Sequence, residues 1–149
     1  MKLISSYLFT LLAGLMALTT VAAQAGSVTA IGGYDAVSYH NAKRPVRGNG
    51  HFLTVHDDVT YLFSNKENQA TFEANPAQYV PAYGGYCAFG ASVGKKFVGD
   101  PEVWRLVDNK LYLNLDVEIQ SMWLKDVPGR IKTADAKWLK IKNVPAAEL

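Results

Sequence analysis

The side chain best suited to chemistry in this chain is its single thiol. Cys87, the only cysteine among 149 residues, follows the Gly84-Gly85 pair in the stretch YVPAYGGYCA, residues 79–88. Adjacent glycines adopt dihedrals closed to other residues and let another group approach closely. If a helix opens at Cys87, its first amides favour a thiolate, which binds soft metals and reacts with oxidants. The alternative is a buried, inert cysteine, since free cysteines are among the most buried residues.

Two further side chains are candidate ligands for a metal ion near Cys87. Asp35 stands beside Tyr34, which directly follows a second Gly-Gly pair at residues 32–33, and His40 follows a short predicted strand that could approach another segment. A thiolate with an imidazole favours a soft metal such as copper or zinc. The alternatives are a structural hydrogen-bond acceptor for Asp35 and a solvated surface side chain for His40. Aromatic residues that could line a pocket reaching the thiol are Tyr34, Tyr39, Tyr83, Tyr86 and Trp104.

Other classes of function find little support in the sequence. No serine stands in a Gly-x-Ser-x-Gly elbow, and there is no phosphate-cradling glycine loop, which argues against a hydrolase or a nucleotide enzyme. Paired metal-ligand spacings such as Cys-x-x-Cys or His-x-x-x-His are absent as well. The net charge of +2 is close to neutral, so we expect no binding to nucleic acid. A binding protein for a metal ion or small ligand is favoured over an enzyme.

The N-terminus has the pattern of a secretory signal peptide. Lys2 precedes an uncharged apolar run from Leu8 to Val21, and small residues follow at positions 23 and 25. This arrangement predicts a signal peptide at residues 1–25, cleaved after Ala23 or Ala25. A transmembrane anchor needs about 20 apolar residues, and this run is shorter and interrupted. We therefore expect a periplasmic or secreted protein with no stable membrane anchor after cleavage.

The first half of the remaining chain predicts a strand, a hairpin and a helix. Residues 34–39 alternate in polarity and indicate a short strand. Residues 51–55 and 59–63 are β-branched and aromatic and flank an acidic turn, which predicts a hairpin. Ser64 and Glu67 fit a capping box for a helix over residues 65–74, and one further helical turn is expected after Pro76.

The second half predicts a helix, another hairpin and two final helices. Residues 86–93 are small enough for a closely packed helix, and residues 103–107 and 111–115 indicate the hairpin. Asp116 caps a helix from Val117 to about Lys125, and a last helix starts at Pro128. We expect a single α+β domain over residues 31–141, in which the two hairpins form an antiparallel sheet, and a frayed tail at residues 142–149. No internal repeat is expected.

Several segments together resemble a YHS domain, in particular the longer exported form found in bacteria. The likeness extends over nearly all of residues 31–141. It rests on residues 34–39, 61–64, 75–79, 83–88, 99–101 and 111–114, and on Asn68, Phe72, Trp104, Trp123 and Asp126.

The resemblance implies an association with metals or with redox-active sulfur. In the short metal-linked members of the family, cysteines stand at the positions of Ser64 and Asn68, so this chain departs from their thiolate pair. Cys87 belongs instead to the longer exported form. Three hypotheses result: a non-enzymatic site for copper or zinc near Cys87, a thiol-redox protein that uses Cys87 with an external thiol, and a structural or interaction module in which Cys87 only packs.

Overall fold

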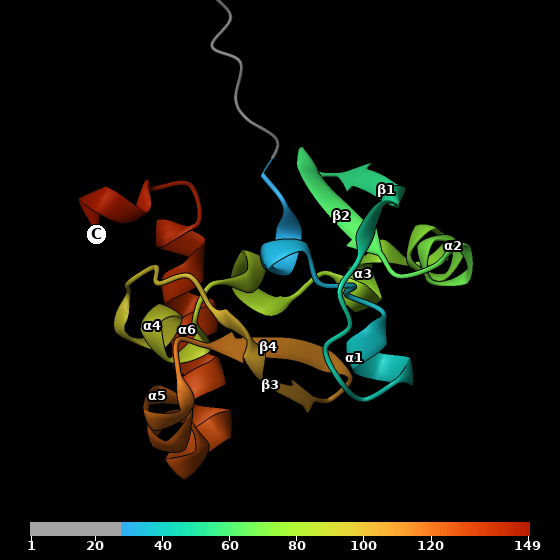
Figure 1. Cartoon of the computed structure of the whole chain (residues 1–149). Coiled ribbons are helices and arrows are strands. Elements are labelled where there is room, and N and C mark those ends of the chain that lie inside the picture. The colour runs from blue at the N-terminus through green and yellow to red at the C-terminus, as the bar shows by residue number, and fades with distance from the viewer. Residues whose placement is uncertain (1–27) are drawn as a thin grey trace, which may run out of the picture.

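The computed structural model describes residues 28–149, and the expected signal peptide at residues 1–25 lies outside them. The architecture is α+β, as predicted, with two β-hairpins that are each followed by a helix (Figure 1). We label 3-10 turns η. The elements in chain order are η1 (Ala30–Gly33), α1 (Ser38–Asn41), β1 (Asn49–His56), β2 (Val59–Phe63), α2 (Lys66–Ala74), α3 (Pro76–Tyr79), η2 (Ala82–Gly85), α4 (Ala88–Val93), β3 (Asp100–Val107), β4 (Lys110–Asn114), α5 (Val117–Trp123), η3 (Leu124–Asp126), α6 (Val127–Ile141) and η4 (Ala146–Glu148).

Both predicted hairpins are present, and each forms its own two-stranded antiparallel sheet instead of joining a shared one. The turn of the first hairpin uses Asp57 and Asp58 at φ 49° and 60°, and the second uses Asp108 and Asn109 at φ 48° and 60°. Positive φ at both central positions is typical of the tight turns that match strand twist, and Asp and Asn tolerate it. The acidic and amide residues between the strands are thus explained by turn geometry.

Two local predictions in the first half are wrong. Residues 34–39 form no strand, because the Asp35 side chain accepts a hydrogen bond from the Val37 amide (2.9 Å) and turns the chain into α1. Ser64 does not cap α2. Asn65 takes that role by accepting from the Asn68 amide (2.8 Å), while the Ser64 hydroxyl donates to Asp35 instead (2.7 Å).

The helices of the second half follow the sequence prediction closely. Asp116 caps α5 through the amide of Ile119 (2.8 Å), and Pro128 stands in the first turn of α6. The last residues, expected as a frayed tail, contain the short turn η4. In addition, the Lys96 ammonium donates to the carbonyl groups of Lys142 and Val144, each at 2.7 Å.

Contrary to the expectation of no internal repeat, the chain contains two equivalent units. The first repeat covers residues 30–79 and the second covers residues 82–130. Each consists of a 3-10 turn, a short helix, a bulged hairpin, a capped helix and the start of another helix. Their opening segments, AIGGYDA at 30–36 and AYGGYCA at 82–88, are identical at five of seven positions. Asp35 of the first repeat therefore occupies the same position as Cys87 of the second.

Backbone geometry confirms this equivalence in detail. The residues that precede the last helix of each repeat, Asn75 and Asp126, have the same angles, φ −155° and ψ 71°. Ile31 and Tyr83 both take a left-handed conformation, at φ 51° and 54°. The same backbone hydrogen bonds recur as well: Asp35 N to Val46 O and Cys87 N to Phe97 O, both 2.8 Å, and Gly48 N to Gly33 O (3.0 Å) and Gly99 N to Gly85 O (3.2 Å).

The repeats pack together through the second hairpin. Its Leu111 and Leu113 are buried in the core cluster of the first repeat, and Trp104 lies edge to face on Tyr39 with ring centroids 5.3 Å apart. The opposite face of the same hairpin, including Tyr112, packs against Trp123 of α5 in a second core cluster. Because the second hairpin contributes to both clusters, it joins the two repeats into one core.

Gly48 and Gly99 hold equivalent positions in the two repeats, and substitution of each tests how closely the backbone packs there. A Cβ at Gly48 would lie 2.5 Å from the carbonyl carbon of Leu62, and one at Gly99 would lie 2.6 Å from the Cβ of Leu113. We expect Gly48→Ala and Gly99→Ala each to lower the free energy of unfolding by about 1–3 kcal/mol, because the backbone must shift. Gly50→Ala meets nothing within 4 Å and serves as the control, with an expected change within about 0.5 kcal/mol. Urea denaturation measures all three, and equal stability of Gly99→Ala and Gly50→Ala would contradict the packing described.

Candidate functional site

The centre of the first repeat is the fully buried carboxylate of Asp35. Its Oδ1 accepts from the Val37 amide, while Oδ2 accepts from the Ser64 amide (2.9 Å), the Ser64 hydroxyl (2.7 Å) and Asn68 Nδ2 (2.6 Å). Buried carboxylates need such partners, because an unpaired charge in the interior is costly. The structure thus brings Asp35 together with Ser64 and Asn68, which lie 29 and 33 residues further along the sequence.

A polar crevice of about 380 Å³ opens beside this network. Its lining includes the buried Asn68, whose Oδ1 accepts from Asn41 Nδ2 (3.0 Å), and the exposed carboxylate of Glu67. No lysine or arginine lines it, so the charge at the crevice is negative. The lining residues are Ser38, Asn41, Ala42, Val46, Ser64, Asn65, Glu67 and Asn68.

Cys87 is fully buried at the N-terminal end of α4. The predicted helix does open there, and the sulfur caps it by accepting from the Gly90 amide (3.3 Å). The thiol also lies 3.8 Å from Asn114 Oδ1, which in turn accepts from the Phe89 amide. An enclosed thiol with these partners acts as a small packed side chain in this conformation.

The region around Cys87 is the apolar counterpart of the polar crevice. At the positions of Val46, Ser64 and Asn68, the second repeat has Phe97, Leu115 and Ile119. Phe97 and Leu115 are 46% and 39% exposed, so this surface is hydrophobic and accessible although the thiol beneath it is not. The same region of the fold therefore carries the polar side chains of Ser64 and Asn68 in the first repeat and only hydrocarbon side chains in the second.

His40, the third candidate ligand, lies at the contact between the repeats. Its Nδ1 is 3.2 Å from Asn109 Oδ1 in the turn of the second hairpin, and its ring stands edge to face on Tyr79. Partial burial lowers the pKa of His40, because desolvation disfavours the imidazolium form. The imidazole therefore contributes mainly to packing between the repeats.

The three residues expected as metal ligands lie in different surroundings. Asp35 is bound to Ser64 and Asn68, Cys87 faces Asn114, and His40 faces Asn109. In residues 28–149 no three histidine, cysteine, aspartate or glutamate side chains gather in a group that could hold a metal ion.

The five aromatic residues expected to line a pocket have other contacts. Tyr34 donates to Glu102 (2.8 Å), Tyr39 donates to the carbonyl of Pro101 (3.0 Å), and Tyr86 lies beside Lys96 and Trp138. Burial raises the pKa of Tyr39 well above its usual range. Tyr83 donates to Asp135, and Trp104 packs on Tyr39. None of the five lines the polar crevice beside Asp35.

Sequence reasoning missed Ser38 and Asn41 of the crevice, and it named Ser64 and Asn68 only as positions where metal-linked members of the resembled family have cysteines. Ser38 and Asn41 lie in α1. The alternating polarity of residues 34–39 had instead predicted a strand in this region. Ser64 and Asn68 are four residues apart, a spacing that places two side chains on one side of a helix start. Their polarity between two hydrophobic segments was the available signal.

Within the described part of the chain, no helix is long and apolar enough to cross a bilayer. No family model, curated protein or solved structure matches the sequence or the fold.

The rate at which the Cys87 thiol is alkylated tests whether this side chain is buried. We expect iodoacetamide to alkylate the thiol of the native protein at least about 100-fold more slowly than in urea, because reaction requires local opening. The control is Val93→Cys in a Cys87→Ser background, since position 93 at the end of α4 is exposed. That control should react at nearly the same rate in both states. A native Cys87 rate within about threefold of the unfolded rate would contradict the buried position.

Proposed function

We propose that this chain is an exported, non-enzymatic binding domain of the YHS type that holds a small hard cation in the polar crevice beside Asp35. The observation that carries the proposal is the convergence of Ser64 and Asn68 on the Asp35 carboxylate, next to an open cavity without basic residues. The family resemblance supports it, because these two positions are the ones where metal-linked members have cysteines.

The donor atoms favour a hard ion over a soft one. Asp35 Oδ2 already accepts three hydrogen bonds, so this carboxylate orients Ser64 and Asn68 and adds negative potential at the floor of the crevice. Direct ligands would come from Glu67, the Asn41 carbonyl oxygen and water. Ca²⁺, Mg²⁺ and Mn²⁺ prefer such oxygen ligands, whereas copper and zinc prefer thiolate and imidazole.

Copper or zinc binding at Cys87, and thiol-redox chemistry there, have less support. The thiol is enclosed, and its polar contacts are a backbone amide and the side chain of Asn114. A metal site built on Cys87 would require rearrangement of α4, which the sulfur itself caps. A packing role for Cys87 agrees with these contacts.

The test is a titration of the purified protein with Mn²⁺, observed as paramagnetic broadening of backbone amide signals. We expect saturable broadening of residues 38–46 and 64–68, and Ca²⁺ should compete for the site. Glu67→Gln should weaken binding by about three- to tenfold, since it removes the exposed carboxylate of the crevice. Glu118→Gln is the matched control, because Glu118 holds the equivalent exposed position in the first turn of α5.

Cys87→Ser separates this proposal from the soft-metal alternative. Unchanged Mn²⁺ binding in that variant, with no tight Zn²⁺ or Cu⁺ binding in the unmodified protein, supports the polar crevice. The proposal fails if no hard cation broadens the crevice residues, or if Glu67→Gln and Glu118→Gln weaken binding equally.

A further inference from the structure

The second hairpin, formed by β3 and β4, is covered on both faces. On one face, the cross-strand pairs Trp104–Leu113 and Leu106–Leu111 pack against the core cluster of the first repeat. The opposite face packs on Trp123 of α5 through the aromatic ring of β4 described above.

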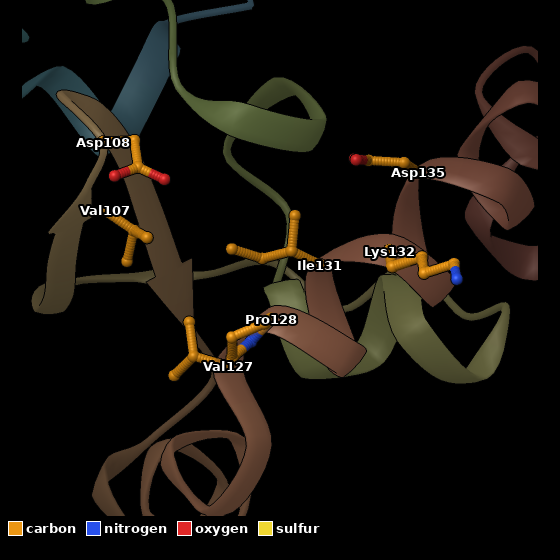
Figure 2. Close-up of a pocket in the computed structure, with 7 residues that line it drawn as sticks. All are labelled: Val107, Asp108, Val127, Pro128, Ile131, Lys132 and Asp135. Atoms are coloured by element: carbon orange, nitrogen blue, oxygen red, sulfur yellow. The ribbon is translucent and has the colours of Figure 1, made fainter.

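That opposite face continues to α6 at the end of β3. Val107 and Ile131 pack there against the second core cluster, and a cavity of about 450 Å³ remains between β3 and α6 (Figure 2). The side chains that line this cavity are Val107, Asp108, Val127, Pro128, Ile131, Lys132 and Asp135. Neither face of the second hairpin is therefore left without a neighbouring element.

The first hairpin, formed by β1 and β2, is covered on one face and open on the other. Tyr61 and Phe63 pack against Phe72 of α2 on the covered face. Figure 1 shows the hairpin at the periphery of the molecule, with α2 beside it. On the other face, Leu53 and Val55 are 44% and 63% exposed.

The exposed side chains have the same place in the fold as the buried face of the second hairpin. Leu53 pairs with Leu62 across the first hairpin. Trp104 and Leu113 form the equivalent pair of the second hairpin, where the first repeat covers them. A contiguous apolar surface that is buried in one repeat and exposed in the other indicates an interaction site.

Val28 extends this surface along β2. Its carbonyl accepts a hydrogen bond from the Thr60 amide (2.9 Å), and its side chain is exposed. We call the surface of Val28, Leu53, Val55 and Leu62 the open face. It shares no residue with the polar crevice beside Asp35.

The two ends of the open face carry opposite charges. At one end, the Arg47 guanidinium lies near Leu62, since a Cβ placed on Gly33 would be 3.7 Å from Leu62 Cδ1 and 3.9 Å from Arg47 Nη1. At the other end, the hairpin turn holds the exposed Asp58. In the described part of the chain, neither Arg47 nor Asp58 forms an ion pair.

We propose that the open face binds the open face of a second copy of this chain in a symmetric dimer. A twofold axis that lies between the two faces and perpendicular to the strands sets the hairpins antiparallel. Arg47 of each copy then meets the turn at Asp58 of the other, while the apolar centres pack together.

The charges favour a second copy over other occupants of the open face. A surface with an apolar centre and opposite charges at its ends is complementary to itself under twofold symmetry. An anionic membrane would be attracted by Arg47 but repelled by Asp58. A partner of one charge sign likewise matches only one end.

The experiment measures self-association of the purified protein by sedimentation equilibrium. One face of a short hairpin is smaller than a permanent dimer interface, so we expect a dissociation constant on the order of 10–100 µM. Two-dimensional amide NMR spectra of the same protein locate the interface. Their concentration-dependent shifts should fall on residue 28 and residues 53–62.

Val55→Lys should weaken self-association at least about tenfold, because it places a charge in the apolar centre of the interface. Val117→Lys is the matched control. Val117 is also an exposed valine, but it belongs to α5, which Figure 1 shows on the far side of the molecule from the first hairpin. This control should leave self-association unchanged.

Charge reversal tests the antiparallel arrangement. Arg47→Glu and Asp58→Lys should each weaken self-association by about three- to tenfold, because like charges then meet at both ends. An equimolar mixture of the two variants should restore it, since each end of the mixed dimer again meets the opposite charge. Thermal unfolding checks both variants, because Arg47 also donates to the Gly32 carbonyl (3.0 Å).

Four outcomes would overturn the proposal. The first is a protein that stays monomeric at millimolar concentration, including one whose open-face signals shift only with anionic vesicles, which would assign the face to a membrane. The others are shifts that fall on a different surface, equal effects of Val55→Lys and Val117→Lys, and a mixture of the charge-reversed variants that associates no better than either variant alone.

Discussion

The first repeat depends on the hydrogen bonds that the buried Asp35 carboxylate accepts. They connect the start of α1 through Val37, the end of β2 through Ser64 and the first turns of α2 through Asn68. Four donors around one charge keep it stable in the interior, and removal of the charge would leave those donors without an acceptor. The same contacts hold Ser64 and Asn68 at the polar crevice, so the fold and the candidate site rest on one interaction.

The second repeat has the same backbone arrangement, but different side chains stand at the equivalent positions. Cys87 occupies the position of Asp35, and its sulfur accepts a single amide hydrogen bond at the start of α4. Phe97, Leu115 and Ile119 replace polar or smaller side chains, so packing takes over from hydrogen bonding. The long α6, which extends beyond the repeat, creates the cavity bordered by Asp108 and Asp135.

Local signals in the sequence predicted most elements, because hairpin turns and helix caps depend on neighbouring residues. The turns at Asp57 and Asp108 and the cap at Asp116 are of this kind. Predictions failed where distant contacts decide the outcome. Asp35 looked like part of a strand because its partners Ser64 and Asn68 are about 30 residues away. The repeat was visible in AIGGYDA and AYGGYCA, but its extent required the backbone geometry.

The free energy of unfolding of Asp35→Ala tests this account most directly. Urea denaturation should show a loss of about 3–5 kcal/mol relative to the unmodified protein, because buried donors of Ser64 and Asn68 lose their acceptor. Cys87→Ala at the equivalent position should cost less, about 1–2 kcal/mol, since the thiol accepts one weak hydrogen bond and fills a small volume. A loss below about 1 kcal/mol for Asp35→Ala would contradict the central role of this carboxylate.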